Sequence, residues 1–223
     1  MTFMKIAELE FGSLLSYTPR GHSPSSIHAR NFMNLLKTEG FVKDATTGRA
    51  VLMSEWVAET IQQYGKELPF SHFFQPTTIL VPAPKSSLMQ PNTLWVPEKI
   101  ASALAAKGIG AKVQPCLKRV NPVPKAATSL ACDRPLPLHH YRSLRVVGTI
   151  PQPDEIVIVD DIITRGSTLM GAANRLADAF PESKIRAFAV MRTISNPDKF
   201  NQLIDPVIGN IELRSFGDTI RRP

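Results

Sequence analysis

Cysteine is scarce in this chain of 223 residues, where Cys116 and Cys132 are the only two. They form no C-x-x-C pair, which excludes a disulfide framework and a four-cysteine zinc ribbon. We expect both to be ordinary thiols in a reducing, cytoplasmic setting. No set of His, Asp and Cys has the spacing of metal ligands either, so the sequence predicts no metal site made of protein side chains alone.

Long hydrophobic runs are also missing. The longest apolar stretches, such as Ile156–Val159, have the length of a strand and fall far short of the roughly 18 residues that a membrane span needs. Glu8 and Glu10 interrupt the N-terminal segment, so we expect no secretory signal. With 43% hydrophobic and 20% charged residues, we expect one folded domain, or one with a small appendage, and no membrane partner.

The positive charge is concentrated in one segment. The net charge of +7 and the pI near 9.6 favour a nucleic-acid partner at first sight. However, residues 112–145 contain seven Lys and Arg and a single Asp, so they carry six of the seven net charges. One short basic segment favours a loop that closes over a small polyphosphate. Nucleic-acid binding through Lys118, Arg119 and Lys125 remains the third alternative.

The N-terminal third of the sequence predicts two helices. Residues 23–37 begin with Ser-Pro-Ser-Ser, a pattern typical of a capped helix, and a second helix at 54–64 is followed by Gly65. We expect residues 1–76 to form a helical, hood-like subdomain and residues 77–223 an α/β core. Tyr17–Gly21 is either a surface loop before a helix cap or part of a cover over the site.

The remainder alternates between strand and helix patterns. The expected elements are strands at 77–81, 156–159, 185–191 and 207–213, and helices at 98–107 and 169–180. Residues 112–153 contain seven prolines, which predicts a long loop or ribbon with little regular structure. Because the strands are continuously apolar, we expect an α/β fold with a mostly parallel central sheet flanked by helices.

The richest pattern links a strand to a helix at 156–180. Asp160 and Asp161 end the strand, and the loop that follows contains Thr164, Arg165, Gly166, Ser167 and Thr168. Unpaired amides at the start of a helix favour an anion, glycine permits close approach of the backbone, and carboxylates accept hydrogen bonds from a vicinal diol. The pattern therefore predicts a sugar-phosphate site. An Asp-Asp strand end with an ordinary Ser/Thr helix cap is the alternative.

Residues 156–168, Ile-Val-Ile-Val-Asp-Asp-Ile-Ile-Thr-Arg-Gly-Ser-Thr, closely resemble the phosphoribosyl-pyrophosphate (PRPP) signature of type I phosphoribosyltransferases. A looser likeness extends from Ile79 to Thr193. The Val-Pro-Ala-Pro string before a helix resembles the branch related to the bacterial competence protein ComF. Members of that branch often begin with a four-cysteine zinc module, which this chain lacks. A role tied to that module, such as DNA uptake, is therefore not implied.

The resemblance implies roles for two loops. Asp160 and Asp161 would hold the ribose hydroxyls at the catalytic centre, and residues 164–168 would hold the 5′-phosphate. Arg165 stands where Thr is frequent and would add a phosphate contact. An earlier loop made of Ala83, Pro84, Lys85, Ser86 and Ser87 would hold the pyrophosphate, mainly through Lys85. A proline-rich turn with a solvated lysine is the alternative for that loop.

The basic segment falls where these enzymes have a mobile loop, here about 112–153. Lys118, Arg119, Lys125 and Arg134 would neutralise the diphosphate, with Arg119 binding pyrophosphate and Lys125 acting in catalysis. Mg²⁺ would arrive with PRPP and lie near Asp160 and Asp161. A solvated surface is the alternative for each base. We interpret His139, His140 and Tyr141 as structural.

The resemblance implies Mg²⁺-dependent transfer of 5-phosphoribose from PRPP to a nitrogenous acceptor, with release of pyrophosphate, by a homodimer. The second possibility is a regulatory module that senses PRPP or a nucleotide without transferring it. No residue pattern identifies the acceptor.

Overall fold

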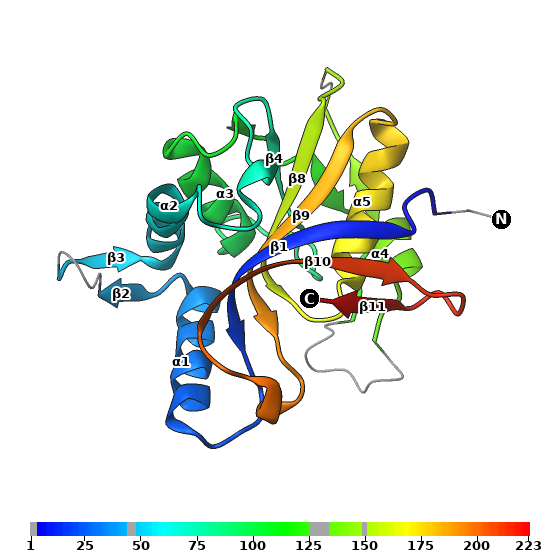
Figure 1. The fold of residues 1–223 in the computed structure, drawn as a ribbon. Coiled ribbons are helices and arrows are strands. Elements are labelled where there is room, and N and C mark those ends of the chain that lie inside the picture. The colour runs from blue at the N-terminus through cyan, green and yellow to red at the C-terminus, as the bar shows by residue number, and fades with distance from the viewer. Residues whose placement is uncertain (1–3, 44–47, 125–133, 149–150) are drawn as a thin grey trace.

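The computed structural model describes residues 4–43, 48–124, 134–148 and 151–223, and its centre is a seven-stranded sheet (Figure 1). The strands follow the order β11-β10-β1-β9-β8-β4-β5. Their bounds are β1 (Glu8–Tyr17), β4 (Ile79–Pro82), β5 (Lys112–Val113), β8 (Glu155–Ile163), β9 (Lys184–Thr193), β10 (Ile204–Leu213) and β11 (Thr219–Arg222). Neighbouring strands pair in parallel along β1-β9-β8-β4-β5, whereas β10 pairs antiparallel with both β1 and β11. The predicted α/β fold with a mostly parallel sheet is confirmed.

Helices cover both faces of the sheet (Figure 1). Helices α1 (Pro24–Thr38), α2 (Met53–Tyr64) and α3 (Val96–Ala106) pack on one face, and α5 (Ser167–Ala179) packs on the other. Along β8, Val157 and Val159 belong to the first core, and Ile156 and Ile158 belong to the second. Burial on both faces explains the continuous apolar strand. In the described ranges, every helix is too short or too polar to cross a bilayer.

The predicted N-terminal helices are present and share a junction. The Ser23 hydroxyl accepts a hydrogen bond from the Ser26 amide at 3.1 Å and caps α1. Glu39 ends α1 with a left-handed φ of 51°, and its carboxylate accepts the Ser54 amide at 3.2 Å in the first turn of α2. A small hairpin lies between the helices, made of β2 (Phe41–Lys43) and β3 (Ala50–Leu52). A short 3₁₀ turn, η1 (Ser71–Phe73), follows α2.

The N-terminal segment is not the purely helical unit that we expected, because it contains β1. This strand lies inside the main sheet, where Phe11 pairs in parallel with Ala187 and antiparallel with Gly209. Leu9, Phe11, Leu14 and Leu15 are each at most 1% exposed. The first segment is therefore part of the α/β core. Because hydrophobic side chains face both layers, the strand lacks the strict alternation that would have revealed it.

The proline-rich region is more regular than expected. Strands β6 (Leu117–Arg119) and β7 (Leu144–Val146) form an antiparallel ribbon, and the short helix α4 (Pro137–Arg142) packs against α5. Lys125 and Cys132 lie outside the described residues. A second 3₁₀ turn, η2 (Pro197–Lys199), connects β9 to β10.

Candidate functional site

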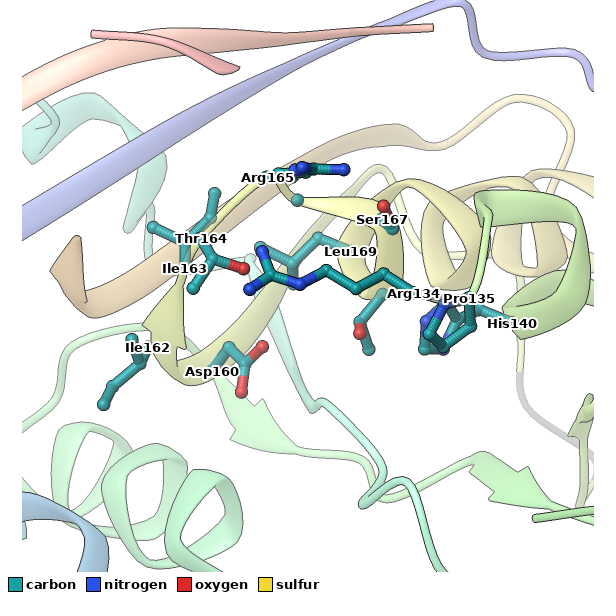
Figure 2. Close-up of a pocket in the computed structure, with 12 residues that line it drawn as sticks. Arg134, Pro135, His140, Asp160, Ile162, Ile163, Thr164, Arg165, Ser167 and Leu169 are labelled. Carbon is teal, nitrogen blue, oxygen red and sulfur yellow. The ribbon is translucent and has the colours of Figure 1, made fainter. Parts of the chain in front are cut away.

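A small pocket with a cavity volume of about 50 Å³ lies where β8 ends and α5 begins (Figure 2). Parallel strands present their carboxyl ends at one edge of a sheet, which is where open α/β sheets bind ligands. The lining residues come from the β8–α5 connection and from the segment that leads into α4. They are Arg134, Pro135, His140, Asp160, Ile162, Ile163, Thr164, Arg165, Gly166, Ser167, Thr168 and Leu169. All five residues of the predicted phosphate loop thus border one cavity.

Gly166 forms the turn that starts α5. Its φ of 86° lies in the left-handed region, and a Cβ added to it would lie 2.7 Å from Ile211 Cδ1. Both the backbone conformation and the neighbour therefore require glycine. Among the described residues, no side chain caps the N-terminus of α5, where Gly166 is the N-cap, so its first-turn amides and the positive end of the helix dipole are available to an anion.

The two acidic residues occupy different positions. Asp160 lines the pocket, whereas Asp161 is not among the lining residues, although both are half-buried. Asp160 Oδ1 accepts the Asp161 amide at 2.9 Å, and Asp161 Oδ1 accepts the Ile162 amide at 2.8 Å. Burial and, secondarily, the Asp161 carboxylate raise the pKa of Asp160 well above its ordinary value. A cation or a hydrogen-bond donor at the pocket would favour ionised Asp160.

The side chains of the loop point in different directions. Thr164 and Arg165 are exposed, and Figure 2 shows the Arg165 side chain directed away from Asp160. Ser167 Oγ lies 2.9 Å from Thr219 Oγ1 of β11. The loop therefore offers an anion chiefly its backbone amides and the helix terminus. Arg165 can reach the same anion only by changing its conformation.

Arg134 is the basic residue that the segment before α4 brings into this pocket. Its side chain extends across the cavity toward Thr164 and Asp160 (Figure 2). Among the described residues its buried Nε atom has no hydrogen-bond partner. From the sequence, we expected Arg134 to neutralise the diphosphate. The structure places it beside the predicted phosphate loop.

His140 forms part of the pocket wall and is 3% exposed. Burial, followed by the charges of Arg119 and His139, lowers the pKa of His140 to about 3. The imidazole is therefore neutral at physiological pH. The neighbouring residues have structural contacts: His139 Nδ1 accepts the Leu136 amide at 3.3 Å, and the Tyr141 hydroxyl donates to Asp178 at 2.5 Å.

The predicted pyrophosphate loop begins close to Asp160 but does not line the same pocket. The Ala83 amide donates to Val159 O at 2.8 Å, one residue before Asp160. Trp95 Nε1 donates to Ala83 O at 2.8 Å, and Lys85 Nζ donates to Leu94 O at 2.6 Å. The Lys85 ammonium group is therefore held by the backbone of its own connection. Pro84, Ser86 and Ser87 likewise lie outside the pocket lining.

Arg119 contacts this loop from the protein interior. It is 6% exposed, and its guanidinium donates to Lys85 O and to Ser143 Oγ. The Val123 amide also donates to Ser86 O at 2.9 Å. Arg119 was predicted to bind pyrophosphate directly, but in this structure it is buried and engaged by protein acceptors. Burial also lowers the pKa of Arg119 to about 10, which leaves it charged at neutral pH.

The remaining candidates lie apart from the pocket. Lys118 is exposed on β6, and Cys116 is buried with its pKa raised to about 11 by desolvation. Such a thiol is unreactive at neutral pH. Tyr17–Gly21 connects β1 to α1, and Arg30 Nη1 donates to Gly21 O at 2.9 Å. In the described ranges no three His, Cys, Asp or Glu side chains gather as metal ligands.

Three C-terminal residues that contact the phosphate loop were not predicted from the sequence. Ile211 contacts Gly166, Thr219 contacts Ser167, and Arg221 Nε donates to Thr164 O at 2.8 Å. All three lie more than 40 residues after the loop in the sequence, and only Ile211 belongs to an expected strand. No local pattern indicates contacts of this range.

Comparison with protein-family models found no matching family, and no curated protein matches the chain. The function is therefore inferred from the site itself.

Proposed function

We propose that this protein is a type I phosphoribosyltransferase that transfers 5-phosphoribose from PRPP to a nitrogenous acceptor and releases pyrophosphate. One observation carries the proposal: the Asp160 carboxyl and the uncapped N-terminus of α5, with Gly166 at its turn, border a single pocket. A group that can accept hydrogen bonds from hydroxyls and a group that can bind a phosphate thus border the same pocket, and a sugar phosphate carries both kinds of partner.

The proposed roles follow from the chemistry of each group. The 5′-phosphate binds the first-turn amides of α5, where the helix dipole opposes its charge. Asp160 accepts hydrogen bonds from the ribose hydroxyls, and Asp161 supports the turn that presents it. Mg²⁺ fits this edge of the sheet, because it prefers one or two carboxylates together with substrate oxygens, and when bound it would neutralise the diphosphate. Arg134 excludes water and adds positive charge beside Thr164.

Calorimetric titration with PRPP and Mg²⁺ tests the proposal directly. We expect saturable binding by the wild-type protein and its loss in Asp160→Asn/Asp161→Asn, since the substitutions are nearly isosteric but remove both carboxylates. Asp154→Asn is the matched control, because Asp154 is exposed just before β8 and outside the pocket. Failure of the folded wild-type protein to bind at millimolar PRPP would overturn the proposal.

A second function, PRPP binding without transfer, is favoured by one observation. The Lys85 ammonium donates to Leu94 O at 2.6 Å, and the Arg119 guanidinium is buried against Lys85 O and Ser143. Two of the groups predicted to stabilise departing pyrophosphate are thus engaged elsewhere. In such a sensor, PRPP would bind but no bond to ribose C1 would break.

Pyrophosphate release separates the two functions. The protein is incubated with PRPP, Mg²⁺ and a panel of purines, pyrimidines and other amines, and pyrophosphate is measured over time. Release that depends on one acceptor and is lost in the Asp160/Asp161 double variant supports transfer. Tight PRPP binding with no release across the panel supports the sensor.

A further inference from the structure

The hairpin formed by β10 and β11 contacts the phosphate loop at three successive points. Ile211 lies against Gly166, Thr219 Oγ1 lies 2.9 Å from Ser167 Oγ, and Arg221 Nε donates to Thr164 O at 2.8 Å. Ile211 and Arg221 are direct partners in the register of the two strands. One compact element therefore contacts the loop from Thr164 to Ser167, yet none of its three residues lines the pocket.

Arg221 has the most specific contact of the three. Besides Thr164 O, its guanidinium donates through Nη2 to Thr193 O at 2.6 Å. It thereby joins the connection after β8 to the last residue of β9. Burial, and then the charge of Arg192, lower the pKa of Arg221 to about 10, so the side chain is cationic at neutral pH.

The direction of the Thr164 carbonyl explains why this contact matters. A loop that binds an anion through amides must turn its carbonyl oxygens away, because a carbonyl dipole facing a phosphate is repulsive. Arg221 donates a hydrogen bond to the Thr164 carbonyl oxygen from outside the pocket, so this oxygen faces away from an anion bound in the pocket. Its positive charge also lies behind the start of α5, where it adds to the potential that an anion experiences.

We propose that the β10–β11 hairpin is a clasp that holds residues 164–168 in their anion-binding conformation, with Arg221 as its main positioning residue. The clasp rests on the proposed phosphate-binding role of this loop. It predicts that a residue outside the pocket determines the affinity for the phosphate group.

Arg221 and its neighbour Arg222 provide a matched pair of variants. Arg222 is exposed, and its Nε atom pairs with Glu212 at 2.6 Å on the hairpin itself. We expect Arg221→Met to weaken binding of ribose 5-phosphate by about ten-fold, the loss associated with one charge-assisted hydrogen bond. Arg222→Met removes the same charge and should leave affinity within about two-fold. Arg221→Lys keeps the charge but not the two-carbonyl geometry, so it should recover only part of the affinity.

Two measurements are made on each variant. Calorimetry with ribose 5-phosphate gives affinity, and hydrogen–deuterium exchange without ligand reports the order of residues 164–168. We expect faster exchange confined to this loop and its hairpin partners in Arg221→Met, with core strands β8 and β9 remaining protected. A generally destabilised protein would instead lose protection throughout the sheet, and that result would overturn a specific clasp.

Different experimental results would overturn the clasp and the proposed function. If the wild-type protein binds neither PRPP nor ribose 5-phosphate, the proposed function is overturned, and the exchange data alone decide the clasp. If the wild-type protein binds and Arg221→Met matches Arg222→Met in affinity and in loop exchange, the clasp is overturned while the proposed function stands.

Discussion

Gly171 of α5 lies directly beneath His140 of α4, so closely that a Cβ added to the glycine would lie 2.6 Å from His140 Cβ. The same atom would lie 2.6 Å from Pro137 O and 2.9 Å from Tyr141 N. The backbone of α4 can approach α5 only because position 171 has no side chain. This contact fixes the pocket wall formed by His140 and the start of the segment that carries Arg134.

Gly171→Ala tests this packing role, because the effect of the methyl group on packing and its effect on helix propensity change the stability in opposite directions. In an exposed helix interior, replacing Gly with Ala stabilises by about 0.5–1 kcal/mol. Here we expect destabilisation of about 1–3 kcal/mol, because the methyl group overpacks the α4–α5 contact. Urea unfolding measures the sign directly. A variant that is more stable than the wild-type protein would show that α4 does not pack as described.

Gly166→Ala is expected to impair both stability and phosphate binding. The left-handed φ and the overlap with Ile211 both oppose the added methyl group, so we expect a loss of about 2–4 kcal/mol and much weaker binding of ribose 5-phosphate. Gly217→Ala is the control, since Gly217 has a φ of 82° but nothing within 4 Å of its added Cβ. The control should show only the backbone cost, about 1–2 kcal/mol. Equal losses in the two variants would contradict close packing at Gly166.

Asp160→Asn should stabilise the protein while abolishing sugar-phosphate binding. The folded-state pKa of Asp160 is raised by burial and by Asp161, so the ionised side chain opposes folding once the pH exceeds the unfolded value of about 3.9. The stability gained by the variant should therefore grow as the pH rises from about 4 through the raised folded pKa, and then level off.

Thermal unfolding from pH 3 to pH 8 measures this difference. Asp154→Asn, at an exposed site, should show no comparable trend. A constant difference between Asp160→Asn and the wild-type protein across this range would contradict a half-buried carboxyl group with a raised pKa.

Arg119→Met tests whether Arg119 positions the 83–87 loop. The change leaves Lys85 O without its guanidinium donor and removes the donor to Ser143 Oγ, so we expect destabilisation of about 2–4 kcal/mol and faster amide exchange at 83–87. The adjacent Lys118 is exposed on the same strand, and Lys118→Met should change stability by less than about 0.5 kcal/mol. If both variants remain equally stable and protected, Arg119 does not hold the loop.

The sequence predicted best where local chemistry determines local structure. Ser23 at the start of α1 and the βαβ unit around Gly166 follow from capping, periodicity and glycine conformation. It predicted less where long-range packing decides. Nothing near Arg119 indicated that its partner would be the Lys85 carbonyl, and nothing near Thr164 indicated Arg221. The strand-to-helix connection that carries Asp160 and Gly166 follows from its local pattern, but the pocket wall of His140 depends on the close contact of α4 with Gly171, which is visible only in three dimensions.

The position of β1 between β9 and β10 constrains the order in which the central sheet can form. Phe11 is synthesised well before its sheet partners Ala187 and Gly209, which lie 176 and 198 residues further along the chain. Until then the strand has no edge to join, and its buried leucines need protection from aggregation. A truncated product that lacks β9 and β10 leaves this apolar strand unpaired and prone to degradation. The central sheet is therefore completed only after β9 and β10 have been synthesised.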